Sequence, residues 1–319
     1  MVKEMRKGIW ISIIICCCML SICACSSEKR IRKSVQSKLD SNLNSMKEIS
    51  MLDADTGWAL TTENEVFHTE NGVEQFQSVH KVETADAITD YFVDACFLNE
   101  SSMYLAYFSS GNVVLESTTD AGKNWNQSII SYQQYGSAYQ VFVSFVDEKN
   151  GYILCCSEPG GGLMNKILFQ TQDGGYNFEV VSDLTNIITG YPTGISFSDI
   201  AHGYVATTYH GEDNCLFSSS DSGVTWKNLL AEKYDEIKDV SYLEGYPPVF
   251  WGEEKKDGIL IVKYVGTEKN SYVAYRTKDR GVNWSVYELV ECKSIRNYSF
   301  RDETVGYIVD EEGNAFYVK

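Results

Sequence analysis

The residues with the clearest potential for chemistry are carboxylates that recur at one place in a repeated motif. Four segments align without gaps on the pattern Ser/Thr-x-Asp-x-Gly-x-Asn/Thr-Trp/Phe, at 118–125, 171–178, 219–226 and 277–284. A degenerate copy at 69–76 has Asn71 in place of the aspartate. Carboxylates serve as acids, bases and nucleophiles in catalysis. A catalytic carboxylate should, however, be unique to one unit, so repetition in every unit favours a structural role.

Turn chemistry explains the residue types of this motif. A carboxylate beside a tight turn can accept the backbone N–H groups of the turn, and glycine supplies the positive φ. The leading Ser or Thr offers a second local hydrogen bond, and the closing aromatic ring covers the hairpin. The residues expected to do this are Asp120, Gly122, Trp125, Asp173, Gly175, Phe178, Asp221, Gly223, Trp226, Asp279, Gly281 and Trp284.

A second motif alternates with the first and consists of an apolar strand, an acidic turn and a Gly-aromatic pair. Full copies occupy 51–58, 145–152, 197–204 and 300–307, and weaker copies lie at 97–104 and 250–260. We expect the recurring aspartates of this motif to belong to turns as well. They are Asp53, Asp147, Asp199 and Asp302.

The first motif matches the Asp box, also called the BNR repeat. The alternation of both motifs resembles the photosystem II assembly and stability factor family, and Asp boxes alone are shared with sialidases, some glucanases and sortilin-type receptors. The resemblance covers about 270 residues and implies a β-propeller, a fold that hosts many functions. We therefore transfer no photosynthetic role to this chain.

Two kinds of glycosidase are the enzymatic alternatives. A sialidase-like site needs three arginines to clamp a carboxylate, and the chain from Met51 onward has only Arg276, Arg280, Arg296 and Arg301, of which the first two lie at one Asp box. A glycoside hydrolase with two carboxylates stays open as the alternative function, because acidic residues are abundant. The sequence therefore leans towards a non-catalytic protein, with no catalytic residue assigned.

Other signatures of active sites or cofactor sites are weak. The run Pro159-Gly160-Gly161-Gly162 lacks the Lys-Ser/Thr of a phosphate-binding loop. The four histidines lack HExxH spacing, and no cysteine pair has CxxC spacing. We predict no metal and no cofactor. The net charge of −17 disfavours nucleic acid as a partner.

The alternation of the two motifs predicts four strands in each unit. A turn joins the first strand to the second, a loop joins the second to the third, and an Asp-box turn joins the third to the fourth. With 21 Tyr, 14 Phe, 24 Gly and only 4 Pro, the composition suits an all-β chain. One such sheet cannot bury both faces alone, whereas radial stacking can. Six four-stranded blades fit residues 48–319 best, and five or seven stay open. The last unit lacks an outer strand, which a segment within 35–44 could supply.

The N-terminus predicts export and lipid anchoring. Lys3, Arg6 and Lys7 precede an apolar stretch, 8–20, that is too short to span a bilayer comfortably. Ile22-Cys23-Ala24-Cys25 resembles the bacterial lipobox. The resemblance implies cleavage of the signal peptide 1–25 before Cys25 and attachment of acyl chains such as palmitate to Cys25. Residues 26–47 read as a basic polar tether, with the domain at the outer face of the cell membrane.

Features outside the repeat are the candidates for a binding surface. The segments 158–165 and 233–248 depart from the repeat, and exposed aromatic side chains suit contacts with protein or sugar. The candidates are Tyr132, Tyr135, Tyr139, Tyr246 and Trp251. We therefore expect a membrane-anchored scaffold that binds a protein or a glycan.

Overall fold

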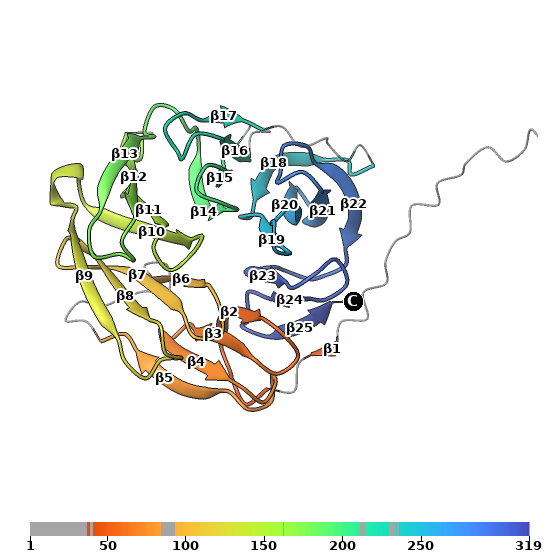
Figure 1. Cartoon of the computed structure of the whole chain (residues 1–319). Coiled ribbons are helices and arrows are strands. Elements are labelled where there is room, and N and C mark those ends of the chain that lie inside the picture. Colours follow the sequence, from red (N-terminus) through yellow and green to blue (C-terminus); the bar gives the residue numbers. More distant parts are fainter. Residues whose placement is uncertain are drawn as a thin grey trace, which may run out of the picture. The chain divides into compact units, whose positions relative to one another are not determined.

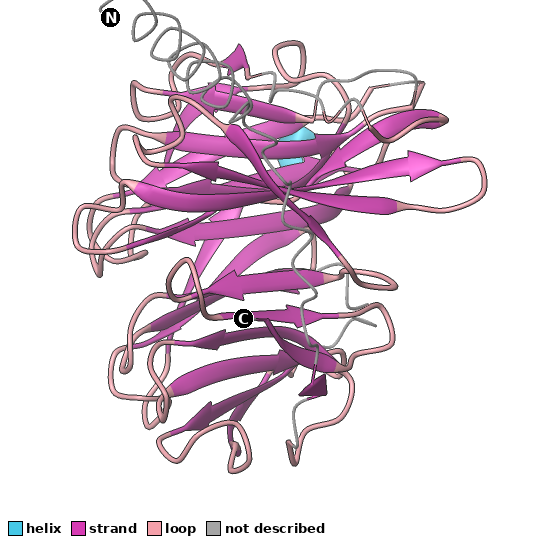
Figure 2. Cartoon of the chain, turned by 90° about the vertical axis from the view of Figure 1, so that its right-hand side faces the viewer, coloured by secondary structure: helices cyan, strands magenta, loops and turns pink. Residues whose placement is uncertain are grey.

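The computed structural model describes residues 37–38, 41–83, 93–161, 163–210, 215–229, 234 and 236–318. The signal peptide expected at 1–25, with Cys25, and much of the tether 26–47 lie outside these residues. The described part consists of strands and loops with one short helical turn, η2 (Gln133–Tyr135), which confirms the all-β class (Figure 2). Among the described residues, no helix is both long and apolar enough to cross a membrane.

The strands form six blades around a common centre (Figure 1). Blade 1 contains β2 (Met46–Met51), β3 (Gly57–Thr61), β4 (Glu65–Thr69) and β5 (Gln77–Lys81). Blade 2 contains β6 (Val93–Phe97), β7 (Met103–Ser109), β8 (Asn112–Thr118) and β9 (Asn126–Ser131). Blade 3 contains β10 (Ala138–Phe145), β11 (Gly151–Ser157), β12 (Lys166–Thr171) and β13 (Glu179–Asp183).

The other three blades follow the same antiparallel order. Blade 4 contains β14 (Tyr191–Phe197), β15 (Gly203–Thr208), β16 (Leu216–Ser219) and β17 (Lys227–Asn228). Blade 5 contains β18 (Val240–Gly245), β19 (Val249–Trp251), β20 (Asp257–Gly266), β21 (Ser271–Thr277) and β22 (Ser285–Val290). Blade 6 contains β23 (Asn297–Phe300), β24 (Gly306–Val309), β25 (Ala315–Val318) and β1 (Ser37–Lys38).

Two strand pairings differ from a simple arrangement in which each blade is a separate sheet of four consecutive strands. Blades 4 and 5 form one nine-stranded sheet because Thr208 of β15 pairs with Glu244 of β18. In blade 6 the outer position is taken by β1, which pairs antiparallel with β25. The strand therefore comes from the segment 35–44, in which the sequence predicts a closing strand.

The alternation of strand direction gives the ring two different faces. Turns between the first and second strands, and the Asp boxes between the third and fourth, lie on one face, which we call the turn face. Loops between the second and third strands, and the connections from blade to blade, lie on the other face, which we call the mouth face. All of the repeated acidic turns therefore share the turn face.

Six apolar clusters fill the spaces between neighbouring blades. The cluster between blades 6 and 1 joins Met46, Ile49 and Met51 to Tyr307 and Val309, and so closes the ring. Neighbouring cysteines on β11 serve different clusters, because successive side chains of a strand point to opposite faces. Cys155 packs between blades 2 and 3, and Cys156 packs between blades 3 and 4.

Aromatic rings join the blades in sequence. From blade 1 to blade 5, the second strand of each blade places an aromatic ring against the ring near the end of the inner strand of the next blade. The centroids of Tyr104 and Phe145 are 3.4 Å apart, and those of Tyr152 and Phe197 are 3.6 Å apart, with nearly parallel planes. Such pairs add about 0.5–1.5 kcal/mol beyond the area they bury. This contact explains the aromatic residue of the second motif.

The glycine before each of these aromatics is required by close approach. A Cβ atom on Gly151 would lie 2.5 Å from the ring of Phe145, and one on Gly203 would lie 2.3 Å from the ring of Phe197. The motif therefore uses glycine for space at these two positions.

An interrupted inner strand distinguishes blade 5 from the others. Pro247 and Pro248 separate β18 from β19, and proline cannot donate to a sheet ladder. The buried hydroxyl of Tyr298, from blade 6, accepts the N–H of Ile261 at 3.2 Å and donates to the carbonyl of Pro247 at 2.7 Å. One side chain thus completes the hydrogen bonding of the neighbouring blade.

We expect Tyr298→Phe to destabilise the fold by about 1–3 kcal/mol, because it leaves the buried N–H of Ile261 and the partly buried carbonyl of Pro247 without this partner. Urea unfolding of the purified protein measures the loss. The control is Tyr176→Phe, at a side chain that is 68% exposed, which should change the free energy of unfolding by less than about 0.5 kcal/mol. Equal effects of the two variants would contradict the role given to Tyr298.

Candidate functional site

The Asp boxes are closed hydrogen-bonded turns, as the sequence predicts. In the first box, Asp120 Oδ1 accepts the backbone N–H of Asn124 at 2.8 Å, and Oδ2 accepts its side-chain amide at 2.7 Å. Thr118 Oγ1 accepts the N–H of Gly122, whose φ is +81°. The same backbone N–H bonds recur in the boxes at 171–178, 219–226 and 277–284. Hydrogen bonds from Asn124 lower the pKa of Asp120.

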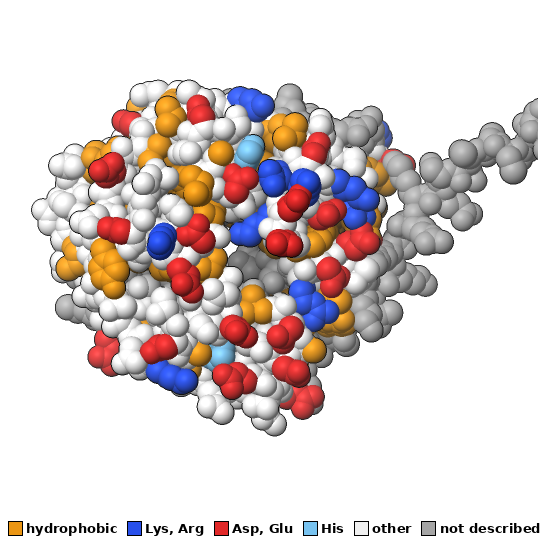
Figure 3. All heavy atoms as spheres, in the orientation of Figure 1, with side chains coloured by type: hydrophobic (Ala, Val, Ile, Leu, Met, Phe, Trp, Pro, Cys, Tyr) orange, Lys and Arg blue, Asp and Glu red, His pale blue; other side chains and the backbone are white. Residues whose placement is uncertain are grey.

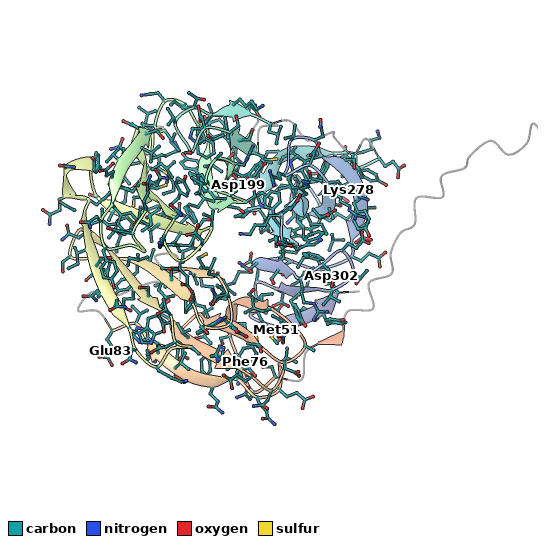
Figure 4. All side chains as sticks on the ribbon, in the orientation of Figure 1. Met51, Phe76, Glu83, Asp199, Lys278 and Asp302 are labelled. Atoms are coloured by element: carbon teal, nitrogen blue, oxygen red, sulfur yellow. The ribbon has the colours of Figure 1, made fainter. Side chains whose placement is uncertain are left out.

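The aspartates of the second motif are also used within their own turns. Asp53 Oδ1 accepts the N–H groups of Asp55 and Thr56 at 2.8 and 2.6 Å. The same pair of bonds forms at Asp147, Asp199 and Asp302. In Figure 4, Asp199 and Asp302 lie nearer the centre of the ring than Phe76 and Glu83, as expected for turns that follow inner strands. The repeated carboxylates are therefore engaged in turns.

The four arginines are paired with acidic residues. Charged side chains gather over the part of the ring formed by β18–β25 (Figure 3). Arg276 pairs with Glu303 and Asp257, Arg280 with Asp199, Arg296 with Glu311, and Arg301 with Asp302. The domain's arginines thus form separate ion pairs and do not converge as a three-arginine clamp.

The aromatic residues predicted for a binding surface lie in different places. Tyr132 is fully buried in the core between blades 2 and 3, so it is not a surface residue, and Tyr135 packs against the same core. Tyr139 and Tyr246 line a cavity at the mouth face. Tyr246 is largely buried and donates its hydroxyl to the carbonyl of Ile295 at 2.7 Å. Trp251 lines the central channel.

The central channel and its mouth form two connected cavities. The channel cavity, about 450 Å³, is lined by the inner strands of all six blades. The mouth cavity, about 500 Å³, lies where these strands begin and also includes Pro159 and Met164 from the non-repeat loop 158–165. The residues shared by both cavities are Glu48, Asp94, Thr193, Tyr246, Arg296 and Asn297.

Side chains from one blade satisfy backbone N–H groups on the inner edge of the next. These edges face the channel and have no further strand to pair with, so their polar groups need other partners. Asp94 Oδ2 accepts the N–H of Val143 at 2.7 Å, and Cys96 Sγ accepts that of Phe145 at 3.2 Å. Glu48 accepts a hydrogen bond from the backbone of Ala95. The two carboxyls therefore have a structural role.

Burial changes the acidity of both carboxyls. Glu48 is only 7% exposed, and desolvation raises its pKa to about 8, with the charge of Asp94 adding to the rise. Desolvation raises the pKa of Asp94 to about 6, against the hydrogen bond from Val143 and the charge of Lys47. Lys47 Nζ donates to the carbonyl of Val93. This part of the channel thus holds two buried carboxyls that share the neighbouring charge of Lys47.

Sequence reasoning missed Glu48 and Asp94, although a signal for them existed. When the inner strands are aligned on the residue that opens each second motif (Met51, Phe97, Phe145, Phe197, Phe250 and Phe300), the third residue before it is a carboxylate only in blades 1 and 2. The other four positions hold Phe142, Gly194, Pro247 and Asn297. Carboxylates unique to their blades are the ones that could have a role beyond turn formation.

We expect the free energy of unfolding of Glu48→Gln, relative to that of wild type, to increase with pH. Because the pKa of Glu48 is raised on folding, the native state holds this proton more tightly, and stability falls as pH rises from about 5 towards 8. Glutamine removes that loss, at most about 1.4 kcal/mol per pH unit. Urea unfolding of wild type and variant from pH 5 to pH 9 measures the difference.

Asp120→Asn is the control, because the pKa of Asp120 is lowered and its carboxylate stays ionised throughout this range. Its effect on stability should be constant from pH 5 to pH 9. A constant effect of Glu48→Gln as well would contradict the raised pKa.

Comparisons with solved structures support the fold alone, since every identity is low. YCF48 bound to a D1 peptide aligns at 11% identity with a TM-score of 0.53, covering 89% of this chain and 94% of that one. The SapL1 lectin in complex with alpha methyl fucoside aligns at 10% identity with a TM-score of 0.52, covering 86% and 90%. The GH74 enzyme of Niastella koreensis aligns at 10% identity and 0.52, covering 88% of this chain but 53% of the enzyme.

Sequence comparison gives the family. No curated protein sequence matches the chain. The family described as photosynthesis system II assembly factor YCF48 matches residues 87–318, which is more than half of the chain and spans blades 2–6. Together with the Asp boxes and the six-bladed ring, this match shows that the chain belongs to the YCF48 family of BNR-repeat β-propellers.

Proposed function

We propose that this chain is a lipid-anchored binding scaffold that holds a protein segment at the mouth face of its propeller. The observation that carries the proposal is the difference between the residues of the two faces. The repeated carboxylates of the turn face are used in their own turns, whereas the residues of the mouth cavity come from all six blades and do not repeat.

The family supports a protein as the partner. A YCF48 structure contains a bound D1 peptide, so a propeller of this kind can bind a peptide. The mouth cavity offers half-buried aromatic side chains, such as Tyr139 and Tyr191, beside polar groups. Binding sites commonly combine an apolar lining with a few placed polar groups.

Anchoring is the second part of the proposal. The lipobox at 22–25 supports acylation of Cys25, which would hold the propeller at the outer face of the cell membrane. Two acyl chains suffice for stable attachment, whereas one chain gives only reversible binding. The tether 26–47 then connects the anchor to the first blade.

A glycoside hydrolase is the second candidate function, and Glu48 and Asp94 are the observation that favours it. They are unique to their blades, they border the same cavities, and the raised pKa of Glu48 suits a general acid. One structural neighbour is a GH74 enzyme.

We expect Cys25→Ala to move the full-length protein from the membrane fraction to the soluble fraction. Intact-mass analysis should show the loss of the lipid, because no thiol remains at the acylated position. Cys23→Ala is the matched control and should leave both the lipid and the membrane fraction unchanged. Membrane association of Cys25→Ala equal to that of wild type would contradict the anchor.

We expect a displayed library of random peptides, panned on full-length protein in detergent, to yield peptides that bind the mouth. Tyr139→Ala should weaken their binding at least tenfold, about 1.4 kcal/mol, because it removes an aromatic wall of the cavity. Tyr176→Ala, which removes an exposed tyrosine of a turn-face Asp box, should leave binding unchanged.

Two results would contradict the scaffold. One is binding that is lost in Tyr176→Ala and kept in Tyr139→Ala. The other is turnover of a polysaccharide panel that is abolished by Glu48→Gln in a folded protein, which would replace the scaffold with the hydrolase.

A further inference from the structure

The mouth cavity has an acidic side. Asp94 uses Oδ2 for the N–H of Val143, and a carboxylate has two oxygens that together can accept several hydrogen bonds. Glu48 lies at the same position of the adjacent inner strand, and both residues border the mouth cavity and the channel. This side of the cavity therefore offers carboxylate oxygens to a donor.

Other charges at the mouth already have partners. Arg296 pairs with Glu311 at 3.6 Å, and Lys263 pairs with Glu244 at 3.3 Å. Lys47 directs its ammonium to the carbonyl of Val93. The charge of Lys47 also acts on Glu48 and Asp94 and offsets one of these two carboxylates. The pair therefore leaves one negative charge for a ligand to balance when both carboxyls are ionised.

An apolar wall stands on the other side of the cavity. It is formed in blades 3 and 4 by Pro159, Met164, Tyr139, Phe142 and Tyr191. We call this set the aromatic wall. Stems of lysine and arginine side chains pack well on such surfaces while their charged ends reach polar groups, and aromatic faces attract cations.

Exposed apolar side chains also lie on the mouth face outside the lining of the cavity. Tyr209 lies with its ring centroid 6.3 Å from that of Tyr191 and is 37% exposed. Leu163 in the loop beside the cavity is 57% exposed, and Ile187 before β14 is 44% exposed. A small amine would cover only the cavity, whereas an extended segment would also cover these neighbours.

We propose that the mouth binds an extended protein segment that places a lysine or arginine side chain on Glu48 and Asp94 and lays apolar neighbours across the aromatic wall. The inference rests on the proposed function, because it names the chemistry of the partner at the same site. The acidic pair selects the cation, and the wall with Leu163, Ile187 and Tyr209 selects the apolar residues beside it.

Proton release should accompany this binding. The groups around Glu48 are Lys47 on its own strand, Asp94 and Cys96 on β6, and Arg296 on β23. The raised pKa of Glu48 means that the free protein holds a proton there at neutral pH. A bound cation favours the ionised form, so affinity should rise with pH until about 8.

The test uses peptides recovered by panning at pH 8.5. We expect enrichment of lysine or arginine flanked by apolar residues. Replacing that lysine with norleucine, which keeps the stem and removes the charge, should weaken binding to wild-type protein at least tenfold. Calorimetry in buffers of different ionisation enthalpy should show proton release at pH 7. These measurements need no protein variant.

Variants then locate the effect. Glu48→Gln and Asp94→Asn, singly and together, should remove the preference for lysine over norleucine. Glu179→Gln, at an exposed carboxylate of the outer strand β13, should keep it. A preference that survives the double variant would overturn the assignment to this pair.

Other outcomes separate this inference from the proposed function. Peptides that bind at the mouth without a preference for a basic residue would overturn the inference and leave the scaffold standing. Recovery of no peptide, together with binding on a glycan array, would overturn both.

Discussion

The contact on which the structure depends is the aromatic pair between neighbouring blades. A ring from the second strand of one blade lies on the ring that ends the inner strand of the next, as Tyr104 does on Phe145. Its polar end then bonds the following turn: Tyr152 donates its hydroxyl to the carbonyl of Ile200 at 2.6 Å. Since a single blade leaves a face unburied, this contact joins blades 1 to 5. The mixed apolar clusters between blades 5 and 6 and between blades 6 and 1 complete the ring.

Closure of the ring brings the inner strands together around the channel and determines which polar groups face it. Inner strands meet with unpaired backbone edges, and polar side chains such as Asp94 and Cys96 satisfy the N–H groups of the next blade. Where that side chain is a carboxyl, burial raises its pKa, and a bound cation would favour its ionised form. The carboxyls that satisfy the N–H groups of the inner strands are thus also the groups that a ligand at the channel mouth could contact. The exposed aspartates of the turn face, in contrast, accept hydrogen bonds from their own turns.

Repeated motifs made the fold predictable from the sequence, whereas the candidate site consists of residues that do not repeat. The six blades and the turn roles of Asp120 and Asp53 follow from motifs that recur. Glu48 and Asp94 do not recur, and strand register alone decides that they share a cavity. Tyr132 shows the same limit, because its departure from the repeat suggested a surface role, yet it fills the core between blades 2 and 3.

Hydrogen–deuterium exchange of the full-length protein, with and without a peptide recovered by panning, tests the separation of the two faces most directly. We expect slower exchange at the mouth, within residues 93–97, 138–142 and 191–193, and unchanged exchange in the Asp boxes at 118–125 and 219–226. Slower exchange in the Asp boxes without change at the mouth would contradict this separation.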